Sequence, residues 1–257
     1  MFCDSHLRNA CQRLFDIRIL NGTALAYTAV AASANVIGAI AVVSHSRWSV
    51  RALDNMVALS AGFMVSVALL DLAPDAILTH GANAALVILI GYLLVHLTQH
   101  SLAPHFHFGE EVHHVTKIVS FSALAGLMLH TFVDGVAIAS GFGVSEALGI
   151  LVFLAILLHK LPEGLAISSL FLAAGESRGA ALAASGALAL SSVLGALLTQ
   201  QLPILQQWGL PLAAGVTLYV GASNLVPEFQ GKKGWNLPVS FFLGCALYYA
   251  ARRIVGS

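Results

Sequence analysis

The stretch HTFVDGVAIASGFGVSEALGILVFLAILLHKLPEGLAISS, residues 130–169, is the most informative part of this 257-residue chain about its architecture. It places a histidine and a carboxylate in each of two long apolar runs, with a short polar break between the runs. A membrane-spanning helix needs about 20 mostly apolar residues, and each run is long enough. The stretch therefore predicts two consecutive spanning helices that carry polar groups deep in lipid.

The composition extends this interpretation to the whole chain. Hydrophobic residues make up 58% of the sequence and charged residues only 9%, whereas soluble domains carry about 25% charged residues. Because unpaired backbone cannot be solvated in lipid, the sequence predicts an all-α polytopic membrane protein with a single transmembrane domain, 1–257. The eight predicted transmembrane helices are 22–43, 53–77, 84–100, 117–142, 147–173, 179–201, 209–227 and 237–252.

The basic residues suggest an orientation. Lys and Arg occur in the connections after the first, third, fifth and seventh predicted helices and are absent after the second, fourth and sixth. By the positive-inside rule the basic connections face the cytoplasm and both termini are extracytoplasmic, although arginines near the termini oppose this assignment. The first 20 residues lack an apolar core, so we interpret them as a short polar tail rather than a cleaved signal peptide.

Internal repeats indicate how the helices are arranged. HTFVDGVAIAS at 130–140 aligns without gaps to HKLPEGLAISS at 159–169, and DLAPD at 71–75 resembles NLVPE at 224–228. Oppositely directed copies are how secondary transporters place a substrate site at mid-depth, so we predict a 3+2+3 inverted-repeat arrangement of the helices. Small residues within 31–38 and 179–186, among them Gly38, Gly179 and Gly186, predict close helix approach.

Two histidines and two carboxylates form the candidate metal site. His130 and Asp134 are four residues apart, as are His159 and Glu163, so each pair lies on one helix face. Near the membrane centre an ionised carboxylate costs several kcal/mol unless it is paired, protonated or bound to a cation. Imidazole with carboxylate suits Zn²⁺, Fe²⁺, Mn²⁺ or Cd²⁺, whereas Mg²⁺ and Ca²⁺ prefer oxygen ligands. The alternative is a hydrogen-bonded network or a proton relay without metal.

HTFVDG and HKLPEG closely resemble the paired signatures on helices 4 and 5 of the ZIP (Zrt/Irt-like protein) family of divalent metal transporters. The resemblance extends over the eight spans, the long connection after the third span, and GVTLYV before LVPE in the seventh. It implies that His130, Asp134, His159 and Glu163 are ligands of a transport site. The chain departs from the family at Val133, where proline is common, and at Asp134, where glutamate is usual.

Some family members hold a second metal beside the first, and the corresponding positions here are Thr131, Lys160 and Ser192. These residues offer few ligands and one cation, so we expect a single transported metal per protein. We hypothesise that Lys160 is a tethered substitute for a second cation, which limits metal affinity and keeps release fast. The alternative is a lysine that forms a salt bridge to Glu163 or Asp71 for stability alone.

Other polar residues are candidates for the route of the ion. The pathway candidates on the second and seventh predicted helices are Asp71, Asp75, Asn224 and Glu228. The alternative is that they are solvated residues at helix ends with no role in transport. The segment 101–116 is predicted to be a His-rich cytoplasmic loop that captures exiting metal, with a loop of no metal-binding function as the alternative. Its candidate ligands are His105, His107, His113 and His114.

Together the residues and the resemblance predict transport of a divalent transition metal toward the cytoplasm by alternating access, with Zn²⁺ as the leading candidate. The metal is a transported substrate rather than a cofactor. An intramembrane zinc-dependent hydrolase is the alternative, but HExxH is absent and a four-ligand shell leaves no water to activate, so no enzyme is expected. The net charge is zero, which gives no case for nucleic acid. The expected partner is a lipid bilayer, of a plasma, inner or organelle membrane, and a homodimer is left open.

Overall fold

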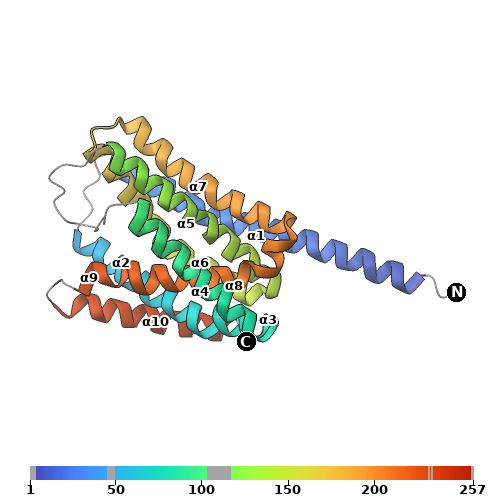
Figure 1. Ribbon diagram of the computed structural model, residues 1–257. Helices are drawn as coiled ribbons and strands as arrows, with labels where there is room; N and C mark the ends of the chain where they lie inside the picture. The colour runs from blue at the N-terminus through green and yellow to red at the C-terminus, as the bar shows by residue number, and fades with distance from the viewer. Residues whose placement is uncertain (1–3, 45–49, 103–116, 231, 233, 256–257) are drawn as a thin grey trace.

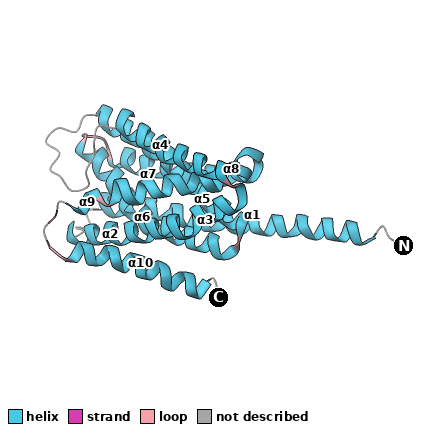
Figure 2. Ribbon diagram, turned by 60° about the horizontal axis from the view of Figure 1, so that its bottom comes forward, coloured by secondary structure: helices cyan, strands magenta, loops and turns pink. Residues whose placement is uncertain are grey.

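A computed structural model describes residues 4–44, 50–102, 117–230, 232 and 234–255, and these residues form helices but no strand (Figure 2). The prediction of an all-α chain is confirmed. Within the described residues the helices make eight rods, two of which continue through a π-helical turn (Figure 1). They are α1 (Asp4–Val43), α2 (Val50–Val67) with η1 (Ala68–Leu72) and α3 (Ala73–His80), α4 (Ala82–Leu102), α5 (Lys117–Val144), α6 (Glu146–Ala173), α7 (Arg178–Gln201), α8 (Pro203–Tyr219) with η2 (Val220–Leu225) and α9 (Pro227–Gln230), and α10 (Asn236–Val255).

Five helical segments are long and apolar enough to cross a membrane, and they coincide with five of the predicted spans. They are 22–43, 51–80, 117–144, 146–173 and 178–201. The predicted spans at 84–100, 209–227 and 237–252 coincide with α4, α8–η2 and α10, which fall short of the same length and composition criteria within the described residues.

Helix α1 is longer than the predicted span. It has 40 residues, which corresponds to about 60 Å of helix, and its N-terminal part extends beyond the bundle (Figure 1). The expected short polar tail is therefore helical from Asp4 onward. No proline or glycine precedes Gly22, so no residue in this stretch breaks the helix.

Reciprocal glycine contacts bring helices together in pairs. In each of four pairs among the described helices, a glycine of either partner lies where an added Cβ would meet a backbone carbonyl oxygen of the other. Such close backbone approach provides the van der Waals contact that associates helices in lipid. The pairs are α1–α6 (Gly38, Gly164), α2–α10 (Gly62, Gly244), α4–α8 (Gly91, Gly215) and α5–α7 (Gly135, Gly195).

The prediction of close approach is confirmed at Gly38 and is not met at Gly179 or Gly186. Gly38 makes the expected close contact with α6. By contrast, a Cβ at Gly186 would meet nothing within 4 Å, and one at Gly179 would meet only its own neighbour Ser177. Helix α7 instead approaches α5 through Gly195, nearer its other end, because close approach depends on where the helices cross.

Both π-helical turns immediately precede a proline. Pro74 lies in the first turn of α3 after η1, and Pro227 begins α9 one residue after η2. Each proline lacks an N–H and so removes a helical hydrogen bond, which explains an irregular turn at these two places. Asp71 lies in the first of these turns and Asn224 in the second, so both pathway candidates belong to irregular backbone.

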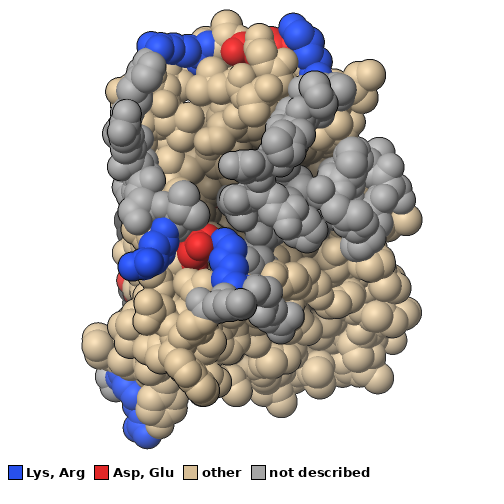
Figure 3. Space-filling view, turned by 90° about the vertical axis from the view of Figure 1, so that its left-hand side faces the viewer, with Lys and Arg blue, Asp and Glu red and all other residues tan. Residues whose placement is uncertain are grey.

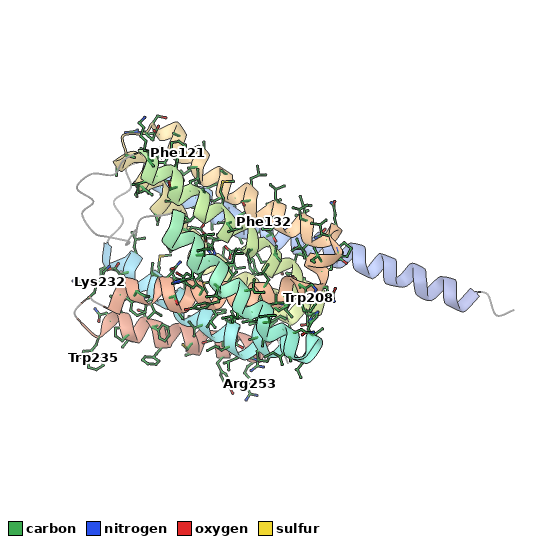
Figure 4. The ribbon with its side chains drawn as sticks, viewed as in Figure 1. Phe121, Phe132, Trp208, Lys232, Trp235 and Arg253 are labelled. Atoms are coloured by element: carbon green, nitrogen blue, oxygen red, sulfur yellow. The ribbon has the colours of Figure 1, made fainter. Side chains whose placement is uncertain are left out.

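The two ends of the bundle carry tryptophan and charged side chains. Figure 4 shows Trp208 and Trp235 at opposite ends, as expected for aromatic residues at the two membrane interfaces. On the end face seen in Figure 3, the basic and acidic side chains of the described residues form small groups. Ion pairs at the helix ends and connections include Lys232 with Asp54 of α2, 2.6 Å apart, and Lys117 of α5 with Glu176, 2.8 Å apart.

Candidate metal centre

The two signature helices hold their histidines at the same depth. His130 is the fourteenth of the 28 residues of α5, and His159 is the fourteenth of the 28 residues of α6. The connection between the helices is the single residue Ser145, whose Oγ caps α6 by accepting a hydrogen bond from Leu148 N at 3.1 Å. This tight connection keeps the helices antiparallel and adjacent, so both histidines lie at the middle of the bundle.

The four predicted ligands converge, and all four are buried. One donor atom from each of His130, Asp134, His159 and Glu163 lies within 4.8 Å of the other three. Asp134 Oδ2 lies between the two imidazoles, 3.4 Å from Nε2 of each. Donors of a tetrahedral zinc site with bonds of about 2.0 Å are about 3.3 Å apart, so side-chain movements of roughly 1 Å would bring these atoms to coordination distance.

Hydrogen bonding prepares His159 as a ligand. Its Nδ1 lies 3.1 Å from the carbonyl oxygen of Ala155, one turn earlier in α6. A ring nitrogen facing a carbonyl must carry the proton, which leaves a lone pair on Nε2 toward the cluster. His159 Nε2, His130 Nδ1 and Glu163 Oε1 have no hydrogen-bond partner among the described residues. Several such atoms at one place leave hydrogen-bonding and ligating capacity that a bound ion could use.

Lys160 lies inside this cluster and is fully buried. Its Nζ donates a hydrogen bond to Glu163 Oε2 at 2.9 Å and forms an ion pair with Asp134 Oδ2 at 2.7 Å. Two carboxylates and one ammonium leave a formal charge of −1 when both imidazoles are neutral. The expected contact with Glu163 is present, whereas Asp71 pairs with other residues.

The glycine that follows each carboxylate positions the signature helices. A Cβ at Gly135, next to Asp134, would meet the carbonyl oxygen of Ser192 on α7. A Cβ at Gly164 would meet the carbonyl oxygen of Asn35 on α1. In the sequence these glycines stand out only as part of the repeat. Their role is to let α7 and α1 approach the backbone directly beside the candidate ligands.

The second-site positions are buried but do not form a second cluster of donors within the described residues. Thr131 donates its hydroxyl to the carbonyl of Met128 in its own helix at 3.1 Å. Ser192 Oγ is buried and has no hydrogen-bond partner there. The ammonium of Lys160 is therefore the charged group that the structure places beside the four donors.

The structure places the pathway candidates in different environments. Asp71 is buried in η1, where it accepts a hydrogen bond from Tyr248 Oη at 2.5 Å and pairs with Arg252 Nε at 3.0 Å. Asp75 and Asn224 are partly buried, in α3 and η2. The Glu228 side chain and the loop histidines at 105, 107, 113 and 114 lie outside the described residues. The contacts of Tyr248 and Arg252 with Asp71 were not predicted, and their only sign in the sequence is polar groups in the last apolar stretch.

Known proteins similar to this chain are zinc transporters. A family profile described as "ZIP Zinc transporter" matches residues 96–250. Zinc transporter ZIP13 of Rattus norvegicus is 32% identical over 128 residues, which cover 47% of this chain and 36% of the relative. ZIP13 of Homo sapiens is 30% identical over 153 residues, 51% of this chain and 40% of the relative. Zinc transporter SLC39A7 of Rattus norvegicus is 31% identical over 125 residues, which cover 44% of this chain and 26% of the relative. The chain thus spans less than half the length of these relatives.

Proposed function

The chain belongs to the ZIP zinc transporter family, and we propose that it carries a divalent transition metal ion across the membrane through the cluster of His130, Asp134, His159 and Glu163. Zn²⁺ is the leading candidate for this ion. The observation that carries this proposal is the convergence of four buried donor atoms within 4.8 Å at the midpoint of two spans. At this depth a bound ion compensates the cost of burying carboxylates. Membership in a transporter family classes this multi-pass membrane protein with transporters rather than hydrolases.

We propose that the ion moves by alternating access within a 3+2+3 inverted repeat. The matched positions of His130 and His159 in two antiparallel helices of equal length support this arrangement. The two π-helical turns before Pro74 and Pro227 support the pairing of α2 with α8. Irregular backbone at corresponding places in two repeats is typical of transporters, where it lines the substrate route.

The proposed direction is toward the cytoplasm, with both termini extracytoplasmic and one transmembrane domain over 1–257. Asp75 and Asp71 follow one another in the rod that ends with α3, at the end of the bundle near the C-terminus (Figure 1). Asn224 lies in the rod that ends with α9 at the opposite end. These residues would guide the ion in and out, and the His-rich loop 101–116 would receive it on the cytoplasmic side.

Lys160 is proposed as a tethered cation that replaces a second metal, so that one metal is carried per protein. Its ion pairs with Asp134 and Glu163 support this role, because both carboxylates are then partly neutralised before a metal arrives. An incoming ion must compete with the ammonium for the same oxygen atoms. The expected consequences are moderate affinity and fast release.

Uptake into proteoliposomes tests the function. The purified chain is reconstituted, and accumulation of Zn²⁺, Fe²⁺, Mn²⁺ and Cd²⁺ is compared with that of the His159→Ala variant. We expect at least one ion to accumulate with the parent and not with the variant. If none of the four enters with the parent protein, the proposed function is wrong. Light scattering on the same preparation determines whether the protein is a homodimer.

A further inference from the structure

We propose that Arg252 is a latch on the route of the metal, holding Asp71 until a divalent cation displaces it. The inference rests on the proposed transport function and adds a residue that sets the metal concentration at which transport half-saturates. Arg252 lies in the last turn of α10 and Asp71 in η1, so the latch joins two rods of the bundle.

Both carboxylate oxygens of Asp71 are engaged by α10. Tyr248 Oη donates to Oδ2 at 2.5 Å, and Arg252 Nε lies 3.0 Å from Oδ1. Tyr248 has no exposed surface and stacks edge-on against Phe63 of α2, with ring centroids 5.7 Å apart. The tyrosine therefore holds Asp71 in place from a fixed position. The arginine occupies the remaining oxygen, which is the one that an incoming ion could bind.

The depth of Asp71 places this pair between the membrane end and the candidate metal cluster. The span that contains it runs from Arg51 to His80, and Asp71 is about 8 Å from the midpoint of that span, at 1.5 Å per residue. Asp75 is one turn, about 6 Å, nearer the end. The cluster lies at the midpoints of α5 and α6. Counted along their helices, Asp75, Asp71 and the cluster therefore lie at successively greater depth from one end of the span that contains Asp71.

Charge and exposure allow the latch to open. The Asp71 side chain is 10% exposed, whereas 46% of the Arg252 side chain is exposed, so the guanidinium can turn into water at little cost. A divalent ion brings two charges to Asp71 and Asp75, while a guanidinium or a monovalent ion brings one. Divalent ions therefore compete best with Arg252, and removing its charge removes the competitor.

The test is the effect of Arg252→Gln on zinc uptake in proteoliposomes. We expect the apparent KM for Zn²⁺ to fall about fivefold, the factor for loss of a half-exposed ion pair, with kcat within about twofold of the parent. Arg253→Gln is the matched control, because it removes the same charge from the next residue. Arg253 donates a hydrogen bond to Tyr249 Oη at 2.9 Å and points away from the bundle (Figure 4). The Arg253→Gln variant should therefore have the same KM as the parent.

A double variant separates the latch from general effects on stability. Asp71→Asn alone should raise KM, and adding Arg252→Gln to it should change KM no further, because Arg252 acts through Asp71. Parent uptake that His159→Ala abolishes establishes transport independently. If the parent transports zinc and His159→Ala does not, an unchanged or higher KM for Arg252→Gln overturns the proposed latch but not the transport function. If the glutamine variant does not fold, Arg252→Met, which removes the same charge, must still lower KM for the proposal to stand.

Discussion

Replacing Lys160 by methionine tests the chemistry of the candidate metal centre directly. Methionine has a similar length and no charge, so the packing around this fully buried side chain is largely kept. The ion pairs with Asp134 at 2.7 Å and Glu163 at 2.9 Å are lost. Without metal, two buried carboxylates then remain without a cationic partner.

The expected magnitude follows from these contacts. Removing one partner of a buried ion pair destabilises a protein by about 3–5 kcal/mol. A bound divalent ion neutralises the same carboxylates, so most of this penalty is absent from the metal-bound state. The difference should appear as tighter metal binding, about 10²- to 10³-fold at about 1.4 kcal/mol per factor of ten. Because tighter binding slows release, uptake at saturating metal should fall.

Three measurements on Lys160→Met check this result. Competition with a zinc-binding fluorophore in detergent gives the affinity, thermal melting with and without zinc gives the stability of each state, and proteoliposomes give the uptake rate. We expect a lower melting temperature than the parent without zinc and a larger increase when zinc is added.

The control is Lys232→Met. Lys232 also pairs with a carboxylate, Asp54 at 2.6 Å, but its side chain is 34% exposed and lies at one end of the bundle (Figure 4). This variant should keep the zinc affinity of the parent. If Lys160→Met also keeps both the affinity and the uptake rate of the parent, Lys160 is not a tethered cation.

Three further predictions concern packing and metal dependence. Gly135→Ala should destabilise the protein by about 1–3 kcal/mol through contact with α7, whereas Gly186→Ala, with nothing within 4 Å, should stabilise it by about 0.5–1 kcal/mol. Melting temperatures that shift in the same direction would contradict this assignment. Zinc at about 100 times its Kd should stabilise the parent by about 2.7 kcal/mol, reversibly with a chelator, and should not stabilise His159→Ala. Tyr92→Phe removes the 2.7 Å hydrogen bond to Ser223 and should cost about 1 kcal/mol, measured by thermal melting.

Local patterns were enough to predict much of the fold and of the candidate site. Apolar length identified five spans that coincide with helices long and apolar enough to cross a membrane, because hydropathy over about 20 residues is a property of contiguous sequence. The spacing of four residues placed His130 with Asp134 and His159 with Glu163 on one face each, because the helical period is fixed by the backbone. The depth of all four residues followed from their positions within their runs.

Sequence information alone is enough to define the set of helices, the faces that carry polar groups, and the chemistry of those groups. Tertiary packing is needed to establish which groups meet across helices: Lys160 with Asp134, Gly135 with α7, and Arg252 with Asp71, 181 positions apart in the chain. The reason is physical. Hydrophobicity and helical period act along the chain, whereas partners between helices depend on where their backbones can approach, and a small residue permits contact without specifying which helix arrives.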